Sequence, residues 1–352
     1  MKDDFHRLLP RVIAGPCSAE SPEQVDCAAS ALKGLGIEWF RAGVWKPRTR
    51  PGCFEGAGLE AIPWLVGVKE RYGLKICTEV ASAKHVEACL DAGFDMLWIG
   101  ARTTSNPFLV QELAEALKGS DVEVFVKNPI TPDPGLWSGA IERLRLCGLQ
   151  RLSVIYRGFQ VAEKVRYRNA PCWDIAIAFR TSFPDIPFYC DPSHMGGDAA
   201  FVGEIAQKAL DLGLDGLMIE THPNPSEALS DRKQQLTPAQ LETVLHTLKI
   251  RESDAEDTGY RSALSALRDR IDSLDETLVD ILAARMEACR EIGRIKKANN
   301  VAILQTGRWE EVRSAVASRA ADMGLDPDFV MRMMNDIHDA SVKEQNIIIS
   351  KQ

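Results

Sequence analysis

Eight short apolar runs dominate the first two thirds of this 352-residue chain, and they limit its possible folds more than any other feature. A strand with one face in water alternates between polar and apolar residues, whereas a parallel strand covered on both faces is apolar throughout. Because these runs are continuous, we expect them to form one buried parallel sheet. They cover residues 11–17, 39–45, 74–80, 96–101, 122–127, 152–157, 187–192 and 216–221.

Helical patterns separate the runs, for example over residues 22–35, 83–92, 107–118 and 199–212. Eight strand–helix units in about 250 residues are the size of a (β/α)8 barrel, and a doubly wound open sheet is the alternative. The count of eight favours the barrel, as does the absence of a G-x-G-x-x-G motif after the first run. We therefore predict the α/β class, with a TIM barrel over residues 1–250.

The chain changes character after Ile250. Residues 251–262 (RESDAEDTGYRS) are polar, mostly acidic and without an apolar period, which is typical of a linker. From Ala263 onward, apolar residues at steps of three and four predict a long amphipathic helix to about Ala298, then helices over 307–323 and 328–349. We expect a separate all-α helical-bundle domain over residues 263–352, and its wide apolar stripe predicts a dimer.

Composition narrows the classes of protein that fit. The formal net charge of −8 disfavours a nucleic-acid partner, and no segment is long and apolar enough to span a membrane. The amino terminus lacks the features of a secretion signal, and the nine cysteines include no C-x-x-C pair. We therefore expect a cytoplasmic protein with reduced thiols and with neither nucleic-acid nor membrane partners.

Polar side chains lie at or just beyond the end of every predicted strand. In a (β/α)8 barrel the carboxyl ends of the strands meet at one mouth, where the chemistry takes place. One polar strand end has little meaning, because charges often cap strands at the surface, but eight facing one mouth predict a site. They are Cys17, Arg41 with Lys46, Glu79, Arg102, Lys127, Arg157, His194 and Glu220.

One subset could bind a metal: Cys17, His194, Glu220, and Asp231 after the last strand. A thiolate, an imidazole and two carboxylates suit a divalent transition metal better than Mg²⁺. Each residue also has an ordinary alternative. Cys17 would serve as a small buried apolar residue, Glu220 as the partner of a lysine and Asp231 as a cap. Spacing alone leaves both interpretations open.

A second subset is cationic. Lysine and arginine usually form a solvated face, but an unpaired cation at the end of an apolar strand is costly. An anionic ligand would offset that cost, and so many cations predict more than one anionic group. The set is Arg41, Lys46, Arg48, Arg102, Lys127 and Arg157.

Five stretches together resemble the type I family of 3-deoxy-D-arabino-heptulosonate 7-phosphate (DAHP) synthases, in the family's order. They are AGPCSAES (14–21), RAGVWKPRTRP (41–51), IGAR (99–102), DPSHMGG (191–197) and IETHPNPSEALSD (219–231). The similarity covers nearly all of residues 10–250. It implies that phosphoenolpyruvate condenses with erythrose 4-phosphate to give DAHP and phosphate.

The resemblance also implies roles for the site residues. The ligands of a divalent metal ion, with Mn²⁺ favoured, would be Cys17, His194, Glu220 and Asp231. Phosphoenolpyruvate would be bound by Arg41, Lys46, Ala101, Arg102, Lys127 and Arg157. Erythrose 4-phosphate would be bound by Lys46, Pro47, Arg48 and Thr49. The related 3-deoxy-manno-octulosonate 8-phosphate synthases carry a K-A-N-R type loop at this point, so the loop favours erythrose 4-phosphate.

Three side chains are candidates for proton transfer in this reaction. Lys127 or His194 would deliver a proton, and Glu79 would orient or activate the attacking water. The metal would polarise the aldehyde oxygen, while fixed cations hold the two phosphorylated substrates in line.

The helical tail carries basic residues of its own. Arg285 and Lys296 share one face of the long helix, and Ser341 and Gln345 lie one turn apart on the last helix. A pocket for a small dianion and an ordinary bundle with inward arginines fit this pattern about equally well.

Three tail segments resemble all-helical chorismate mutases of the AroQ type: residues 267–297, 307–312 and 339–345. The resemblance implies that chorismate rearranges to prephenate in a homodimer, or in a larger assembly built from it. Lys296 and Gln345 would contact the ether oxygen, where negative charge develops. Gln305 and Trp309 depart from the family pattern. The chorismate site would comprise Arg285, Lys296, Arg308, Ser341 and Gln345, with Arg268 from the other subunit.

Together these features predict a bifunctional enzyme of the shikimate pathway whose mutase domain also mediates feedback inhibition. The alternative is a DAHP synthase whose tail is only a ligand-sensing, dimerising module. A metal aldolase acting on another sugar phosphate is a third interpretation.

Overall fold

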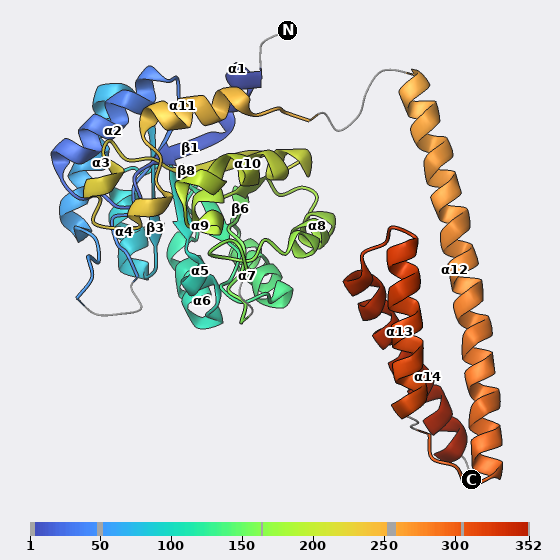
Figure 1. Cartoon of the computed structure of the whole chain (residues 1–352). Coiled ribbons are helices and arrows are strands. Elements are labelled where there is room, and N and C mark those ends of the chain that lie inside the picture. Colours follow the sequence, from blue (N-terminus) through green and yellow to red (C-terminus); the bar gives the residue numbers. More distant parts are fainter. Residues whose placement is uncertain (1–3, 48–51, 163–164, 252–257, 304–305, 351–352) are drawn as a thin grey trace. The chain divides into compact units, whose positions relative to one another are not determined.

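The computed structural model describes residues 4–47, 52–162, 165–251, 258–303 and 306–350. The chain divides into two compact units, Met1–Ser253 and Asp254–Gln352, and each is described by itself (Figure 1).

The first unit is a closed barrel of parallel strands in sequence order, as predicted. The pairing of β8 with β1 closes it, with Gly15 opposite Glu220. The strands are β1 (Val12–Gly15), β2 (Trp39–Arg41), β3 (Lys75–Val80), β4 (Met96–Ile99), β5 (Glu123–Lys127), β6 (Leu152–Tyr156), β7 (Phe188–Cys190) and β8 (Gly216–Glu220).

Helices surround the barrel, and local sequence signals explain where they begin. Ser21 accepts a hydrogen bond from the Gln24 amide at the start of α2, and a proline follows this cap. The helices are α1 (Asp4–Leu8), α2 (Pro22–Gly34), α3 (Ile62–Tyr72), α4 (Ala83–Asp91), α5 (Ala101–Thr104), α6 (Pro107–Leu117), α7 (Pro134–Leu146), α8 (Trp173–Ser182), α9 (Pro192–Gly196), α10 (Val202–Asp211) and α11 (Pro238–Thr247).

The barrel unit has two apolar cores. The larger lies between the strands and the surrounding helices. The smaller fills the interior of the barrel with side chains from alternate positions of the strands, as such barrels require. Its buried members are Ile13, Cys77, Met96, Trp98, Phe125, Ile155 and Met218. The polar strand ends therefore stand above a packed interior and not above a pore.

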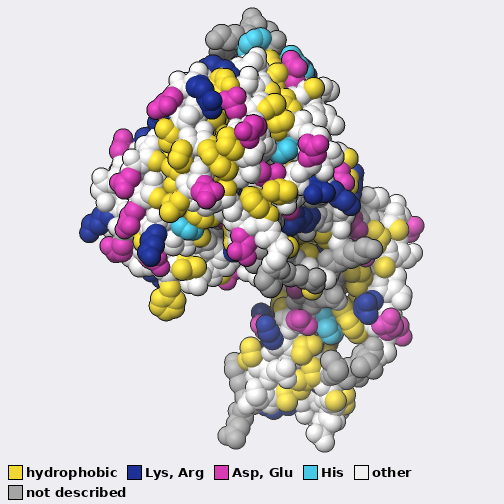
Figure 2. Space-filling model, turned by 90° about the vertical axis from the view of Figure 1, so that its left-hand side faces the viewer, with side chains coloured by type: hydrophobic (Ala, Val, Ile, Leu, Met, Phe, Trp, Pro, Cys, Tyr) yellow, Lys and Arg dark blue, Asp and Glu magenta, His cyan; other side chains and the backbone are white. Residues whose placement is uncertain are grey.

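Charges of both signs are mixed on the face of the barrel unit seen in Figure 2, where Lys and Arg side chains alternate with Asp, Glu and hydrophobic ones. Among the described residues, no helix has the length and apolar character needed to cross a membrane.

The second unit consists of three helices: α12 (Thr258–Ala298), α13 (Thr306–Asp322) and α14 (Pro327–Ser350). Helix α12 begins at Thr258, so the predicted linker over 251–262 is wrong in its second half; residues 252–257 lie outside the described chain. The linker was predicted because these residues lack an apolar period. A helix that has already formed can nevertheless extend through such residues, because each added residue gains one backbone hydrogen bond.

Helix α14 packs against α13 and against the second half of α12, where Arg290 Nε bonds Glu344 at 2.7 Å. The first half of α12 keeps its apolar stripe exposed. The stripe comprises Leu267, Ile271, Leu274, Leu278 and Ile281, each between 45% and 59% exposed. So long a row of exposed apolar side chains is typical of a surface that another protein surface covers.

We expect Leu274→Asp to weaken self-association of the full chain by about 100-fold or more, because the change places a charge within an apolar contact. Sedimentation velocity across a concentration series measures the effect. The matched control is Leu325→Asp, since Leu325 is 52% exposed but lies in the turn before α14. A monomeric wild-type protein, or a variant that associates as the wild type does, would contradict this prediction.

Two candidate active sites

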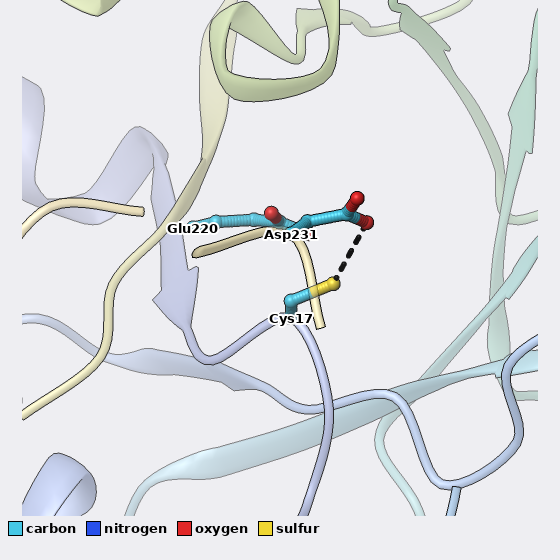
Figure 3. Close-up of side chains that lie close together, drawn as sticks. All are labelled: Cys17, Glu220 and Asp231. Carbon is cyan, nitrogen blue, oxygen red and sulfur yellow. Dashed lines mark hydrogen bonds between the residues drawn. The ribbon is translucent and has the colours of Figure 1, made fainter. Parts of the chain in front are cut away.

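Three of the four predicted metal ligands lie together at the carboxyl ends of neighbouring strands (Figure 3). Donor atoms of Cys17, Glu220 and Asp231 are within 4.8 Å of one another. Cys17 follows β1 and Glu220 ends β8, so the pairing that closes the barrel brings them together. The Cys17 thiol donates to Asp231 Oδ2 at 3.4 Å, and both Cys17 and Glu220 are fully buried.

His194 borders this cluster, with Nε2 at 3.5 Å from Glu220 Oε1. Its orientation comes from Asp191, which caps α9: Oδ1 accepts from the His194 amide at 2.9 Å and Oδ2 lies 2.8 Å from Nδ1. A proton held on Nδ1 by a carboxylate leaves Nε2 free to bind a metal. All four predicted ligands therefore converge, and a thiol, an imidazole and two carboxylates fit a divalent transition metal.

Two residues that the sequence analysis missed hold these ligands in place. Arg168 donates to Asp231 Oδ1 at 3.1 Å and to Gln234 Oε1 at 2.8 Å. Gln234 in turn donates to Glu220 Oε2 at 2.7 Å. Asp231 has φ 45°, a left-handed conformation that is strained for a residue with a side chain and that is enriched at functional sites.

Burial sets the protonation of the cluster. It raises the pKa of the Cys17 thiol to about 12, assisted by Glu220 and opposed by Lys46, whose Nζ lies 3.0 Å from Sγ. Burial would also raise the pKa of Glu220, but the charges of His194 and Arg41 outweigh it and lower that pKa. Without metal, the site at neutral pH therefore pairs a protonated thiol with a carboxylate.

A cavity of about 310 Å³ opens beside the cluster and collects most of the predicted substrate-binding residues. Arg48 and Thr49 lie outside the described residues. The lining residues are Lys46, Pro47, Cys53, Glu79, Ala101, Arg102, Lys127, Ile130, Arg157, Gln160, Arg168, His194 and Asp231.

Arg41 does not line this cavity. It is fully buried, with Nη2 at 3.1 Å from Glu220 Oε1 and its guanidinium 4.9 Å from the centre of the Trp98 ring. Its Nε and Nη1 atoms have no hydrogen-bond partner among the described residues. Two buried donors thus remain for a ligand.

The cations of the cavity are only partly neutralised. Burial lowers the pKa of Arg157 to about 10; Asp191 opposes this, whereas Arg168 and Arg102 add to it. Lys127 donates to Asp191 Oδ2 at 2.7 Å, so one carboxylate serves both Lys127 and His194. Asp191 lies within the DPSHMGG stretch, but its contacts with Lys127 and His194 were not predicted from the sequence. An anion in the cavity would relieve the repulsion between the arginines.

Glu79, at the end of β3, accepts a hydrogen bond from Trp98 Nε1 at 3.0 Å and faces the cavity. A Cβ on Gly100 would lie 2.1 Å from Glu79 Oε1, so a larger residue there would require the carboxylate to move.

The helical unit has a second cavity of about 260 Å³ between α12, α13 and α14. Four of the residues that the resemblance assigns to the chorismate site line it: Arg285, Lys296, Ser341 and Gln345. Trp309 also lines it and stacks on His338 at 3.9 Å. Arg285 donates to Ser341, and the buried Gln345 Oε1 has no partner among the described residues. Arg268 is not among the lining residues, and the side chain of Arg308 lies outside the described part of the chain.

Comparison with known proteins identifies both units. Residues 7–256 match the model of the DAHP synthetase I family. The chain belongs to this family. Residues 267–346 match the model of chorismate mutase type II, so both family assignments made from the sequence are confirmed, as is the fusion of a DAHP synthase domain to a chorismate mutase domain.

Individual relatives include both DAHP synthases and 2-dehydro-3-deoxyphosphooctonate aldolases. A phospho-2-dehydro-3-deoxyheptonate aldolase of Thermotoga maritima is 30% identical over 225 residues, which are 64% of each chain. The crystal structure of the T. maritima DAHP synthase superposes with a TM-score of 0.60 and 28% identity over 67% of each chain. A 2-dehydro-3-deoxyphosphooctonate aldolase of Wolinella succinogenes is 27% identical over 261 residues, covering 67% of this chain and 97% of that protein.

Metal affinity of this DAHP synthase domain should rise with pH. Because the pKa of the Cys17 thiol is about 12, a metal must displace its proton, and affinity should gain about tenfold per pH unit from this group near neutrality. Titration with Co²⁺ from pH 6.5 to 8.5 measures the slope. Cys17→Ala should bind more weakly and lose that contribution; an equal slope in both proteins would exclude Cys17 as a ligand.

Proposed function

We propose that the barrel catalyses metal-dependent condensation of phosphoenolpyruvate with erythrose 4-phosphate, and that the helical unit rearranges chorismate to prephenate. The observation that carries the first assignment is one cavity that joins a thiol–carboxylate–imidazole cluster to several arginines and lysines, in a member of the DAHP synthetase I family. We further propose a cytoplasmic location.

Cys17, His194, Glu220 and Asp231 would hold the metal, and their donor set favours Mn²⁺ or another divalent transition metal. A bound metal supplies Lewis-acid polarisation of the sugar's aldehyde oxygen. Lys46 also contacts this cluster, since its Nζ donates to the Cys17 carbonyl at 3.2 Å.

The cations align two negatively charged substrates. Arg102, Lys127 and Arg157 bind phosphoenolpyruvate, with the unpaired donors of Arg41 below, while the loop from Lys46 and Pro47 holds erythrose 4-phosphate. Fixed cations offset the repulsion between two phosphates and remove the entropic cost of aligning the reacting carbons.

Bond formation joins the enol carbon of phosphoenolpyruvate to the aldehyde carbon of the sugar, after which water adds to the second carbon and phosphate leaves. Lys127 supplies the proton for the new hydroxyl, since it faces the cavity and donates to Asp191. His194, the other candidate, could do so only without its Nε2 on the metal, because Asp191 holds the proton on Nδ1. Glu79, which lines the same cavity, orients the attacking water.

In the helical unit, Arg285 and Arg308 bind the carboxylates of chorismate, with Arg268 from the other subunit of a homodimer. Lys296 and Gln345 stabilise the ether oxygen as its bond to carbon breaks. We also propose that binding of chorismate or prephenate here restrains the barrel. The alternative, a tail that only senses ligand and dimerises, is favoured by Trp309, an apolar residue in the wall of the cavity.

Condensation should require a divalent metal and should proceed faster with erythrose 4-phosphate than with arabinose 5-phosphate. Loss of phosphoenolpyruvate absorbance measures both rates. A chelator should abolish turnover and Mn²⁺ should restore it in the wild type, whereas Cys17→Ala should regain little. Comparable rates with both sugars would favour a broader aldolase, and full activity of Cys17→Ala would refute the ligand set.

Arg285→Ala and Lys296→Ala should each lower chorismate mutase turnover by about 100- to 1,000-fold, because each removes a charge that faces the substrate. Lys343→Ala, which alters an exposed lysine of α14, is the matched control and should leave turnover unchanged. If the wild type shows no turnover while prephenate still slows condensation, the tail is the ligand-sensing module of the alternative.

A further inference from the structure

Glu20 is a nearly buried carboxylate three residues beyond Cys17, and it does not line the cavity of the barrel. Its side chain, 8% exposed, reaches from the loop after β1 to the loop after β8. Oε1 accepts two hydrogen bonds at 2.9 Å, one from Ser18 Oγ and one from the Leu229 amide. Burying a carboxylate this deeply is costly unless hydrogen bonds compensate. The partners of Glu20 therefore indicate which part of the structure it stabilises.

Further bonds join the same two loops. Ser18 Oγ lies 2.5 Å from Ser230 Oγ, and the Cys17 amide donates to Gln235 Oε1 at 2.9 Å. Gln235 Nε2 returns to the Ser230 carbonyl at 2.9 Å. Cys17 and Asp231 therefore project from two loops that are tied together on both sides of the cluster.

The other oxygen of Glu20 faces the segment that carries Glu220. Glu20 Oε2 is 3.7 Å from Nε2 of His222, an imidazole that is 4% exposed. His222 Nδ1 accepts from the Asn224 amide at 3.0 Å, which turns the opposite nitrogen toward Glu20. The Glu20 carboxylate thus contacts the segment next to Glu220, through His222, and the segment next to Asp231, through Leu229.

We propose that Glu20 is a positioning residue that sets the separation between Cys17 and Asp231 by holding the two loops together. The proposal rests on the proposed function only in taking these residues as metal ligands. Asp231 has a left-handed backbone, which persists only where its surroundings impose it, and the Leu229 amide held by Glu20 is two residues away. Loss of such supporting contacts to ligands commonly costs about 10- to 100-fold in metal affinity.

The experiment compares Glu20→Ala and Glu20→Gln with Glu23→Ala, whose carboxylate is exposed on the first turn of α2. Two readouts are used: Co²⁺ affinity with its thiolate-to-metal absorption band, and the alkylation rate of Cys17 in metal-free protein, resolved by peptide mass spectrometry. Glu20→Ala should bind Co²⁺ about tenfold or more weakly, show a weaker band and alkylate faster at Cys17. Glu20→Gln keeps an acceptor at Oε1 and should recover most of the loss, while Glu23→Ala should match the wild type.

The proposal would be overturned if Glu20→Ala matched the wild type in Co²⁺ affinity, in its absorption band and in the alkylation rate of Cys17. A uniform rise in alkylation at all cysteines would mean that the Glu20→Ala protein is unfolded. If Glu20→Ala fails to fold, Ser18→Ala removes the neighbouring link between the loops and should show the same selective change at Cys17. If the wild type binds no Co²⁺, the proposed metal function fails, whereas the metal-free alkylation rates still decide the role of Glu20.

Discussion

The pairing of the last barrel strand with the first is the contact on which the site depends. It places Gly15 opposite Glu220, so the loops that leave β1 and β8 emerge side by side. Cys17 and Asp231 lie on those two loops and Glu220 ends β8, which explains how residues from opposite ends of the domain form one cluster. An open sheet would leave the two strands at separate edges, and the donor set would not exist.

The same mouth concentrates charge in a place where burial is expensive. Arg41 with Glu220 and Lys127 with Asp191 are ion pairs whose side chains are at most 5% exposed. Buried pairs of this kind contribute little to stability, and apolar residues of similar size would serve the fold as well. Their presence above the apolar interior of the barrel therefore points to ligand binding. The energetic cost is borne by the extensive apolar cores below and around them.

The strands could be predicted because a continuous apolar run has a definite end, and the end of a run has a definite place in a barrel. Spacing alone left the role of Cys17, His194, Glu220 and Asp231 open, and their assignment as metal ligands came from the resemblance to the DAHP synthases. Arg168 and Gln234 could not be predicted, since Arg168 lies in an irregular segment and Gln234 in a three-residue 3-10 helix, and neither has a periodicity that fixes position. Arg41 was assigned to the substrate site from its strand end, but the inward direction that pairs it with Glu220 depends on the barrel's three-dimensional packing. The start of α12 at Thr258 was missed because an exposed helical turn needs no apolar pattern.

The high pKa of the Cys17 thiol, about 12, has a consequence for the protein's durability. Peroxides attack thiolates far faster than protonated thiols, and a fully buried thiol is sheltered from them as well. Without a metal, the proposed sulfur ligand is therefore held in the form that peroxides attack slowly.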